Sequence, residues 1–164
     1  MPTIQDTVEV EVPLHTAYDQ WTQFEEFPQF MENVEEVRQL DDAHLHWVAK
    51  VGGRKQEWDA EITRQEPDRC VAWTSTAGLE TGGMVTFEEL APSRTRVIVN
   101  MHYEGEGAAE KVGSAVGMDE RAVHKDLERF KEMIESRGTE SGSWRGTIEY
   151  GQVVEEDIDD LDRL

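Results

Sequence analysis

Four large aromatic side chains, spaced at regular intervals, first suggest a chemical role for this sequence. Trp21, Phe24, Phe27 and Phe30 follow one another at intervals of three residues, which places them on one face of a helical turn. Each ring can remove roughly 150–250 Å² from water. A row of such rings offers an apolar surface to which apolar groups can bind. The four rings are therefore predicted either to fill a core or to line an apolar cavity.

Three further tryptophans pose the same choice, because four in one domain exceed what a compact core usually needs. As core filler they would leave no pocket, whereas as cavity walls they would suit a planar ring or an acyl chain. We favour the cavity. The predicted ligand-contacting residues are Trp21, Phe24, Phe27, Phe30, Trp47, Trp58, Trp73, Ser75, Phe87, Tyr103, Val116, Val123 and Leu127.

Two of these residues are polar and could orient a ligand. By strand alternation Ser75 and Tyr103 point inward, so their hydroxyl groups are the predicted hydrogen-bond donors. For Tyr103 an alternative stays open, in which the hydroxyl reaches a backbone carbonyl group or water.

Metal and nucleophile chemistry is not predicted. His44 and His46 lie two residues apart on one strand, so both face away from Leu45 and Trp47, toward solvent or a cross-strand partner. No third ligand stands at a recognisable spacing, so we expect no metal site and no cofactor. Cys70 is the only cysteine; it is predicted to point outward, with no neighbour that would activate it.

The elements that must position these residues follow from the periodicity. Alternation of apolar and polar residues predicts seven strands, and tight turns between them indicate an antiparallel sheet. The strands are expected at 3–12, 34–40, 44–51, 54–66, 70–75, 84–90 and 95–103. Between the first two, Pro28 divides a helical pattern into two short helices.

A long helix follows the strands. Its apolar stripe comprises Val112, Val116, Val123, Leu127, Phe130 and Ile134. This spacing predicts a helix of about 25–30 residues, and Gly138 is a suitable stop after it. The element order predicts an α+β fold, in which a curved seven-stranded antiparallel sheet wraps around the long helix and leaves room for a tunnel.

Composition restricts the classes of partner. The 164 residues include 36 acidic and 16 basic side chains, a net charge of −20. That balance disfavours nucleic acid and anionic membranes, both of which attract positive charge. No apolar run approaches the roughly 20 residues that cross a bilayer, and no secretory leader is recognisable. We therefore expect a cytoplasmic protein without an integral membrane segment; its oligomeric state is left open.

The C-terminal region differs in composition from the rest. We expect a ligand-binding domain over residues 1–138, and a Gly-, Ser- and acid-rich tail over 139–164 that is largely disordered. Trp144 and Tyr150 are the exceptions, since they could pin part of the tail to the domain or serve as a partner motif.

These segments resemble the polyketide cyclase/dehydrase group of the START-like (SRPBCC) superfamily. The similarity covers about Thr3 to Arg137 and is carried by Val12-Pro13, Ala17–Trp21, Phe24–Met31, Glu57–Ala60, Val71–Trp73 and Asp126–Lys131. It implies a helix-grip fold with an elongated apolar cavity. Members include aromatic polyketide cyclases, ubiquinone-binding chaperones and lipid carriers.

The resemblance does not extend to the residues of the cyclases that carry chemistry. Those enzymes place an arginine, a serine and a tyrosine inside the cavity, and the matching positions here are Ile62, Ala60 and Val34. All three are apolar, so the groups that would move protons and stabilise an enolate are missing there.

Three hypotheses therefore remain. The first is a protein that holds a hydrophobic small molecule, such as a polyketide, quinone, lipid or isoprenoid. The second is a cyclase or dehydrase that uses other groups, with Tyr103, Glu35 and His102 as candidates. The third is an interaction module in which the acidic tail, with Trp144, engages a basic partner.

Overall fold

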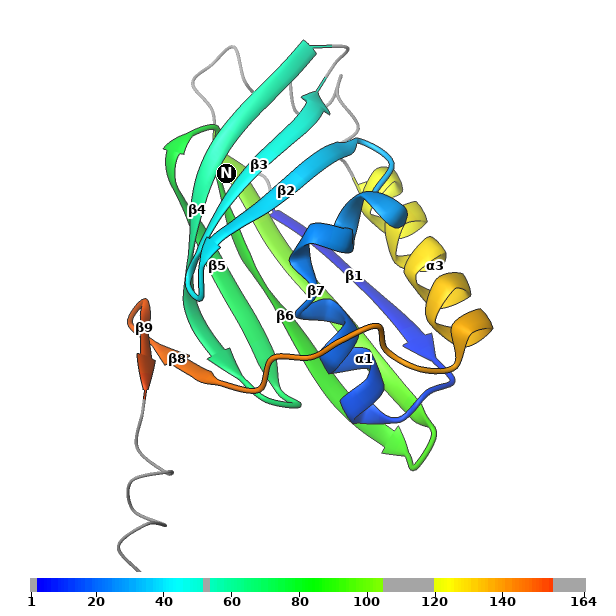
Figure 1. Cartoon of the computed structure of the whole chain (residues 1–164). Helices are drawn as coiled ribbons and strands as arrows, with labels where there is room; N and C mark the ends of the chain where they lie inside the picture. The colour runs from blue at the N-terminus through cyan, green and yellow to red at the C-terminus, as the bar shows by residue number, and fades with distance from the viewer. Residues whose placement is uncertain (1–2, 52–53, 105–119, 155–164) are drawn as a thin grey trace, which may run out of the picture.

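One antiparallel sheet is the main element of the fold (Figure 1). The structure, a computed structural model, describes residues 3–51, 54–104 and 120–154. The strands that form the continuous sheet follow the order β1-β7-β6-β5-β4-β3-β2. Their bounds are β1 (Thr3–Val10), β2 (Val34–Asp41), β3 (His44–Val51), β4 (Arg54–Glu66), β5 (Cys70–Gly78), β6 (Glu80–Ala91) and β7 (Arg94–Glu104).

The long helix α3 (Glu120–Arg137) packs against this sheet beside β1 (Figure 1). The inward face of the helix carries Leu127, Phe130 and Ile134, each at most 2% exposed. The helix ends at Arg137, where Gly138 takes a φ of 76° and its N–H donates to the Ile134 carbonyl oxygen at 2.8 Å. This is the left-handed C-terminal cap that glycine favours. The predicted helix-grip α+β fold is confirmed; the first part of the predicted stripe, with Val112 and Val116, lies outside the described residues.

Two short helices follow β1, as predicted, but they separate before Pro28. Helix α1 (Leu14–Trp21) ends, and a 3-10 helix, η1 (Phe24–Gln29), begins after Thr22 and Gln23. The Thr22 hydroxyl donates to the Asp19 carbonyl oxygen at 2.6 Å. A side chain that bonds its own backbone in this way competes with continuation of the helix. Pro28 is accommodated inside η1.

Two local predictions about strands are corrected by the structure. β6 begins at Glu80 rather than Met84, because Gly82 and Gly83 pair through their backbones with β5 and β7. The pairing needs no side chain, and hydropathy patterns do not detect it. Cys70, predicted to point outward, is 3% exposed. Burial raises the pKa of its thiol, so it is not an activated nucleophile.

The segment after α3 is the largest departure from expectation. Residues 139–154, predicted to belong to a largely disordered tail, run across α1 toward β4 (Figure 1). There they form β8 (Thr147–Glu149), which pairs with β4, and β9 (Gln152–Val154), which pairs with β8. Within the described residues the sheet therefore has nine strands, where seven were predicted. Residues 155–164 lie outside the described part.

We call residues 138–149 the strap. Its Trp144 packs against the hydrophobic core and Ile148 is 0% exposed, so burial of these two side chains compensates for the polar composition around them. Trp144 thus pins the segment to the domain, one of the two roles considered for it. Tyr150 does not, because it is 97% exposed.

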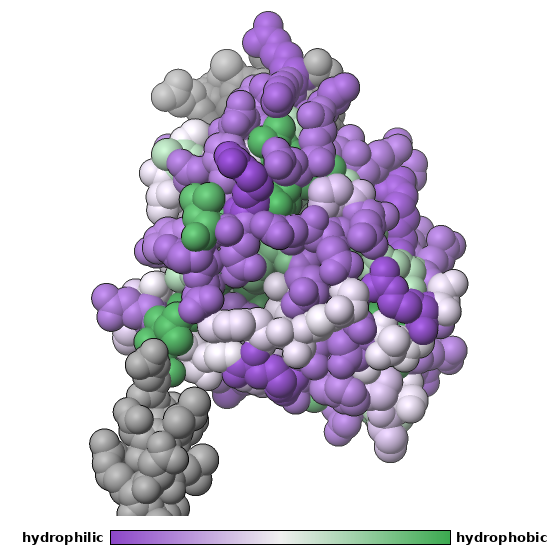
Figure 2. Space-filling view, viewed as in Figure 1, coloured by the Kyte–Doolittle hydropathy of each residue, from purple (hydrophilic) through white to green (hydrophobic). Residues whose placement is uncertain are grey.

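The face of the molecule seen in Figure 2 is mainly polar. Figure 2 shows a hydrophilic face on which hydrophobic side chains appear only as small patches. In the part of the chain that the structure describes, no helix is long and apolar enough to cross a membrane.

Candidate functional site

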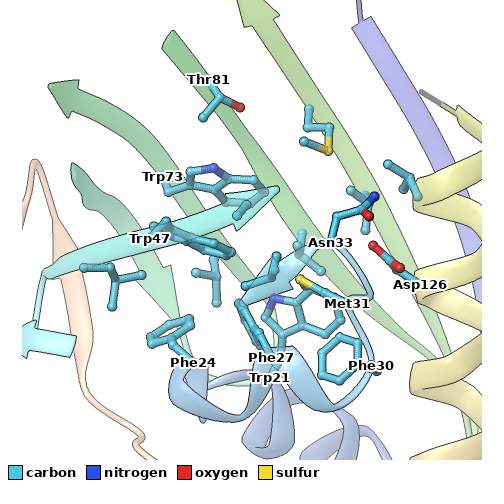
Figure 3. Close-up of a pocket in the computed structure, with 18 of the residues that line it drawn as sticks. Trp21, Phe24, Phe27, Phe30, Met31, Asn33, Trp47, Trp73, Thr81 and Asp126 are labelled. Atoms are coloured by element: carbon cyan, nitrogen blue, oxygen red, sulfur yellow. The ribbon is translucent and has the colours of Figure 1, made fainter. Parts of the chain in front are cut away.

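A cavity of about 150 Å³ lies between the sheet, α3 and the helix pair (Figure 3). Engineered apolar cavities of about this size bind benzene. The described side chains that line it are mostly apolar. They are Trp21, Phe24, Phe27, Phe30, Met31, Asn33, Val34, Leu45, Trp47, Ala49, Lys50, Trp58, Ile62, Val71, Trp73, Thr81, Val85, Val99, Met101, Val123, Asp126 and Leu127.

Most of the residues predicted to contact a ligand lie on this wall. They are Trp21, Phe24, Phe27, Phe30, Trp47, Trp58, Trp73, Val123 and Leu127. Two others do not line it. Phe87 is buried in the core against Tyr18 and Trp21, and the Ser75 hydroxyl accepts the Thr81 backbone N–H at 3.0 Å. The Tyr103 side chain and the whole of Val116 lie outside what the structure describes.

Some of the aromatic side chains fill the core and also line the cavity, the two roles predicted as alternatives. Trp21 is 5% exposed, and its ring centroid lies 5.0 Å from that of Phe130 and 5.4 Å from that of Phe27, so its ring packs into the core. Trp47 and Trp58 stack at 5.6 Å with an interplanar angle of 9°. These pairs fix the rings, and the faces that remain form the cavity wall.

Four polar residues on the wall were missed by the sequence analysis. Asn33, Lys50, Thr81 and Asp126 line the cavity, and Figure 3 shows Asn33 and Asp126 beside each other. A sequence signal existed for Asp126. It stands three residues after Val123, so it shares the inward face of the helix. The strand pattern does not single out the other three residues.

Asp126 is the most perturbed of these groups. Burial raises the pKa of its carboxyl group to about 6, although the Glu32 backbone N–H and the Arg129 guanidinium lower it. Both donate to Oδ1, at 3.4 and 2.9 Å. Arg129 also reaches Glu32 Oε2 at 3.1 Å. The Asp126 side chain is 24% exposed, so the site holds one partly buried carboxyl group that can change protonation near neutral pH.

The three apolar residues at the positions of the cyclase catalytic groups lie at or near the cavity. Ile62 and Val34 line the cavity, and Ala60 is buried beside Trp58. The two alternative candidates, Glu35 and His102, are not among the described residues that line it.

The histidines predicted for the solvated face form cross-strand ion pairs there. His46 lies between Asp59, with Nδ1 and Oδ1 2.7 Å apart, and Glu57, with Nε2 and Oε1 2.9 Å apart. His44 pairs with Asp41 and Glu61. Within the described ranges no cluster of three metal-ligating side chains is found.

A curved antiparallel sheet that grips a long helix around an apolar cavity defines the helix-grip class of START-like proteins. Within that class the chain belongs to the family described as polyketide cyclase / dehydrase and lipid transport, which residues 10–132 match. It is 49% identical over 149 residues to an uncharacterized 17.2 kDa protein encoded in the melC2-rnhH intergenic region of Streptomyces lincolnensis. That alignment covers 90% of this chain and 99% of the relative.

Solved structures show the same fold. A protein from Deinococcus radiodurans is 25% identical, with a TM-score of 0.68 over 84% of this chain and 99% of its own. The Zhui aromatase/cyclase from Streptomyces sp. R1128 has a TM-score of 0.71 at 17% identity, over 87% of this chain and 99% of its own. A START superfamily protein from Mycobacterium smegmatis has a TM-score of 0.63 at 16% identity, over 82% and 95%.

Proposed function

We propose that the protein binds a hydrophobic small molecule in this cavity and holds it without converting it. The observation that carries the proposal is the wall itself, in which aromatic and aliphatic side chains surround an unfilled volume of about 150 Å³. Apolar walls with a few polar groups are typical of small-molecule sites. Membership of a family that includes lipid transport supports binding as the shared property.

The positions that match the catalytic groups of the aromatic cyclases argue against ring closure by those groups. Such a reaction needs donors that stabilise an enolate oxygen. Ile62, Ala60 and Val34 cannot supply them. The proposal therefore assigns the cavity to holding a ligand, for which shape and burial suffice.

Calorimetric titration with 4-methylanisole, a neutral single-ring compound, tests the proposal. A dissociation constant between about 10 μM and 1 mM is expected for a ligand of this size. Binding should also raise the melting temperature as ligand concentration increases, because only the folded state has the cavity. Absence of both heat and thermal shift at millimolar ligand would overturn the proposed function.

A further inference from the structure

The polar side chains of the cavity differ in what they can still offer a ligand. The Thr81 hydroxyl already donates to the His102 carbonyl oxygen at 3.0 Å, so its remaining capacity is to accept. Lys50 is a poor anchor, because its side chain is 65% exposed and its Nζ lies 3.8 Å from Glu35. Asn33 can donate or accept. Two groups inside the cavity can donate: Asn33, and the indole N–H of Trp47, which has no hydrogen-bond partner among the described residues. The other polar groups held inside it are acceptors.

Asp126 is the strongest of these acceptors. Both described donors, Arg129 and the Glu32 N–H, bond to Oδ1, and no described residue donates to Oδ2. Figure 3 shows the carboxylate on the α3 side of the cavity, beside Asn33. Because Oδ1 is held by protein donors, Oδ2 can accept a hydrogen bond from a ligand. Hydrogen bonds to charged acceptors are about twice as strong as those between neutral groups.

We propose that the ligand carries a neutral hydroxyl group on an aromatic ring and that this hydroxyl donates to Oδ2 of Asp126. The inference rests on the proposed function, whose site it shares. The cavity volume suits one ring, and the flat tryptophan walls suit its faces. A ligand ammonium group fits less well, since Arg129 already balances the carboxylate at 2.9 Å. A ketone offers only acceptors, which Asp126 cannot satisfy while it is ionised.

The charged groups around Asp126 determine how binding depends on pH. Arg129 approaches it from α3, Glu32 from the loop before β2, and Lys50 lines the cavity from β3. Because the pKa of Asp126 is about 6, the carboxylate is the main form at pH 7.5 and the neutral acid at pH 5. A phenolic hydroxyl should therefore bind more tightly at the higher pH.

A matched pair of probes, p-cresol and 4-methylanisole, tests this inference by calorimetric titration at pH 5 and pH 7.5. The two differ only in that a methyl group replaces the hydroxyl hydrogen. At pH 7.5 p-cresol should bind about tenfold more tightly than 4-methylanisole. At pH 5 the preference should largely disappear, because the affinity for p-cresol falls while that for 4-methylanisole does not.

Asp126→Asn tests the contribution of the carboxylate alone, because it leaves the other lining residues unchanged. This variant should bind p-cresol about tenfold more weakly than wild type at pH 7.5, without pH dependence, and 4-methylanisole as before. Glu132→Gln, which neutralises an exposed carboxylate of the same helix, should match wild type throughout.

The outcomes distinguish the two proposals. Equal binding of both probes by wild type at both pH values would overturn the role of Asp126 and leave the apolar cavity supported. Failure of both probes to bind would overturn the inference together with the proposed function. The wild-type measurements decide the matter even where the variant does not fold.

Discussion

At the scale of single residues, the partly buried Asp126 lowers the free energy of unfolding. The carboxyl group of an unfolded chain has a pKa of about 3.9, whereas burial raises the pKa of Asp126 to about 6 in the folded protein. The folded state therefore holds the proton more tightly. Its stability falls as the pH rises from about 4 to about 6, and the full cost remains above that range.

Asp126→Asn should consequently stabilise the ligand-free protein at pH 7.5, by about 1–2 kcal/mol. Urea denaturation at pH 4.5 and 7.5 measures this, and the gain should be small at the lower pH. A partly buried carboxyl group with a raised pKa on the wall of a cavity is typical of a functional site. A loss of stability at pH 7.5 would show instead that the ion pair with Arg129 outweighs the cost of burial.

His46 makes the opposite contribution. Hydrogen bonds that its ring donates to the carboxylates of Asp59 and Glu57 raise its pKa. The stabilisation is therefore complete below the ordinary histidine pKa of about 6.5 and is lost as the pH rises through the higher folded value. His46→Gln should therefore destabilise the protein at pH 6 more than at pH 8.5. Urea midpoints at the two pH values measure the difference, with His15→Gln as control. Equal losses at both values would contradict the role of charge.

The site could be predicted from sequence only where periodicity marks it. The aromatic wall followed from residues spaced by three on the helix pair and by two on the strands. Asn33 lies just before β2 and Thr81 lies on β6, and their position at the cavity depends on how the sheet curves. Curvature arises from contacts between distant segments, so a local pattern does not contain it.

At the scale of elements, the strap fixes the helix pair that carries half of the aromatic wall. Arg145 pairs with Asp19 of α1 and, at 2.7 Å, with Asp68 of the turn after β4. Its guanidinium also lies 5.6 Å from the Tyr18 ring centroid. Burial raises the pKa of Asp19, and Arg145 opposes that shift. The strap thus supplies the cation that pairs with a carboxylate whose side chain is only 6% exposed.

Arg145→Ala should therefore cost about 2–4 kcal/mol, because the Asp19 side chain is only 6% exposed. Urea denaturation gives the loss, and Arg145→Lys should recover part of it. The loss should shrink in the Asp19→Asn background, where the charge at position 19 is gone and only the ion pair with Asp68 remains. A loss below about 0.5 kcal/mol, the range of exposed ion pairs, would contradict this role of the strap.

The elements themselves could be predicted wherever a hydropathy period persists. Seven strands, the helix pair and the C-terminal end of α3 were anticipated within a few residues. β8 and β9 were not, because each has three residues and lies in an acidic, glycine-containing segment. β8 pairs with β4 at Arg64 and Gln65, beyond Glu61, which is the last β4 residue that pairs with β3. β9 then pairs with β8. Only the assembled sheet provides that edge.

At the scale of the whole molecule, charge of one sign dominates the surface. A net charge of −20 on 164 residues implies repulsion that destabilises the compact state. Added salt screens this repulsion, since the Debye length shortens to about 10 Å at 0.1 M.

The melting temperature should therefore rise as sodium chloride increases from about 10 mM to about 300 mM. Differential scanning calorimetry measures it, with sucrose at equal osmolality as the uncharged control. A melting temperature that falls with salt would mean that the surface ion pairs stabilise the fold more than the excess of acids destabilises it.

The central claim is that the cavity is open space for a ligand, and filling it is the most direct test. Ala49 lines the cavity and is 3% exposed, so in Ala49→Leu the added carbons should occupy ligand space while the fold is kept. Ala77 on β5 is exposed, and Ala77→Leu is the matched control. Titration with 4-methylanisole should show at least tenfold weaker binding for Ala49→Leu and wild-type binding for Ala77→Leu. Unchanged affinity in a folded Ala49→Leu protein would contradict the account.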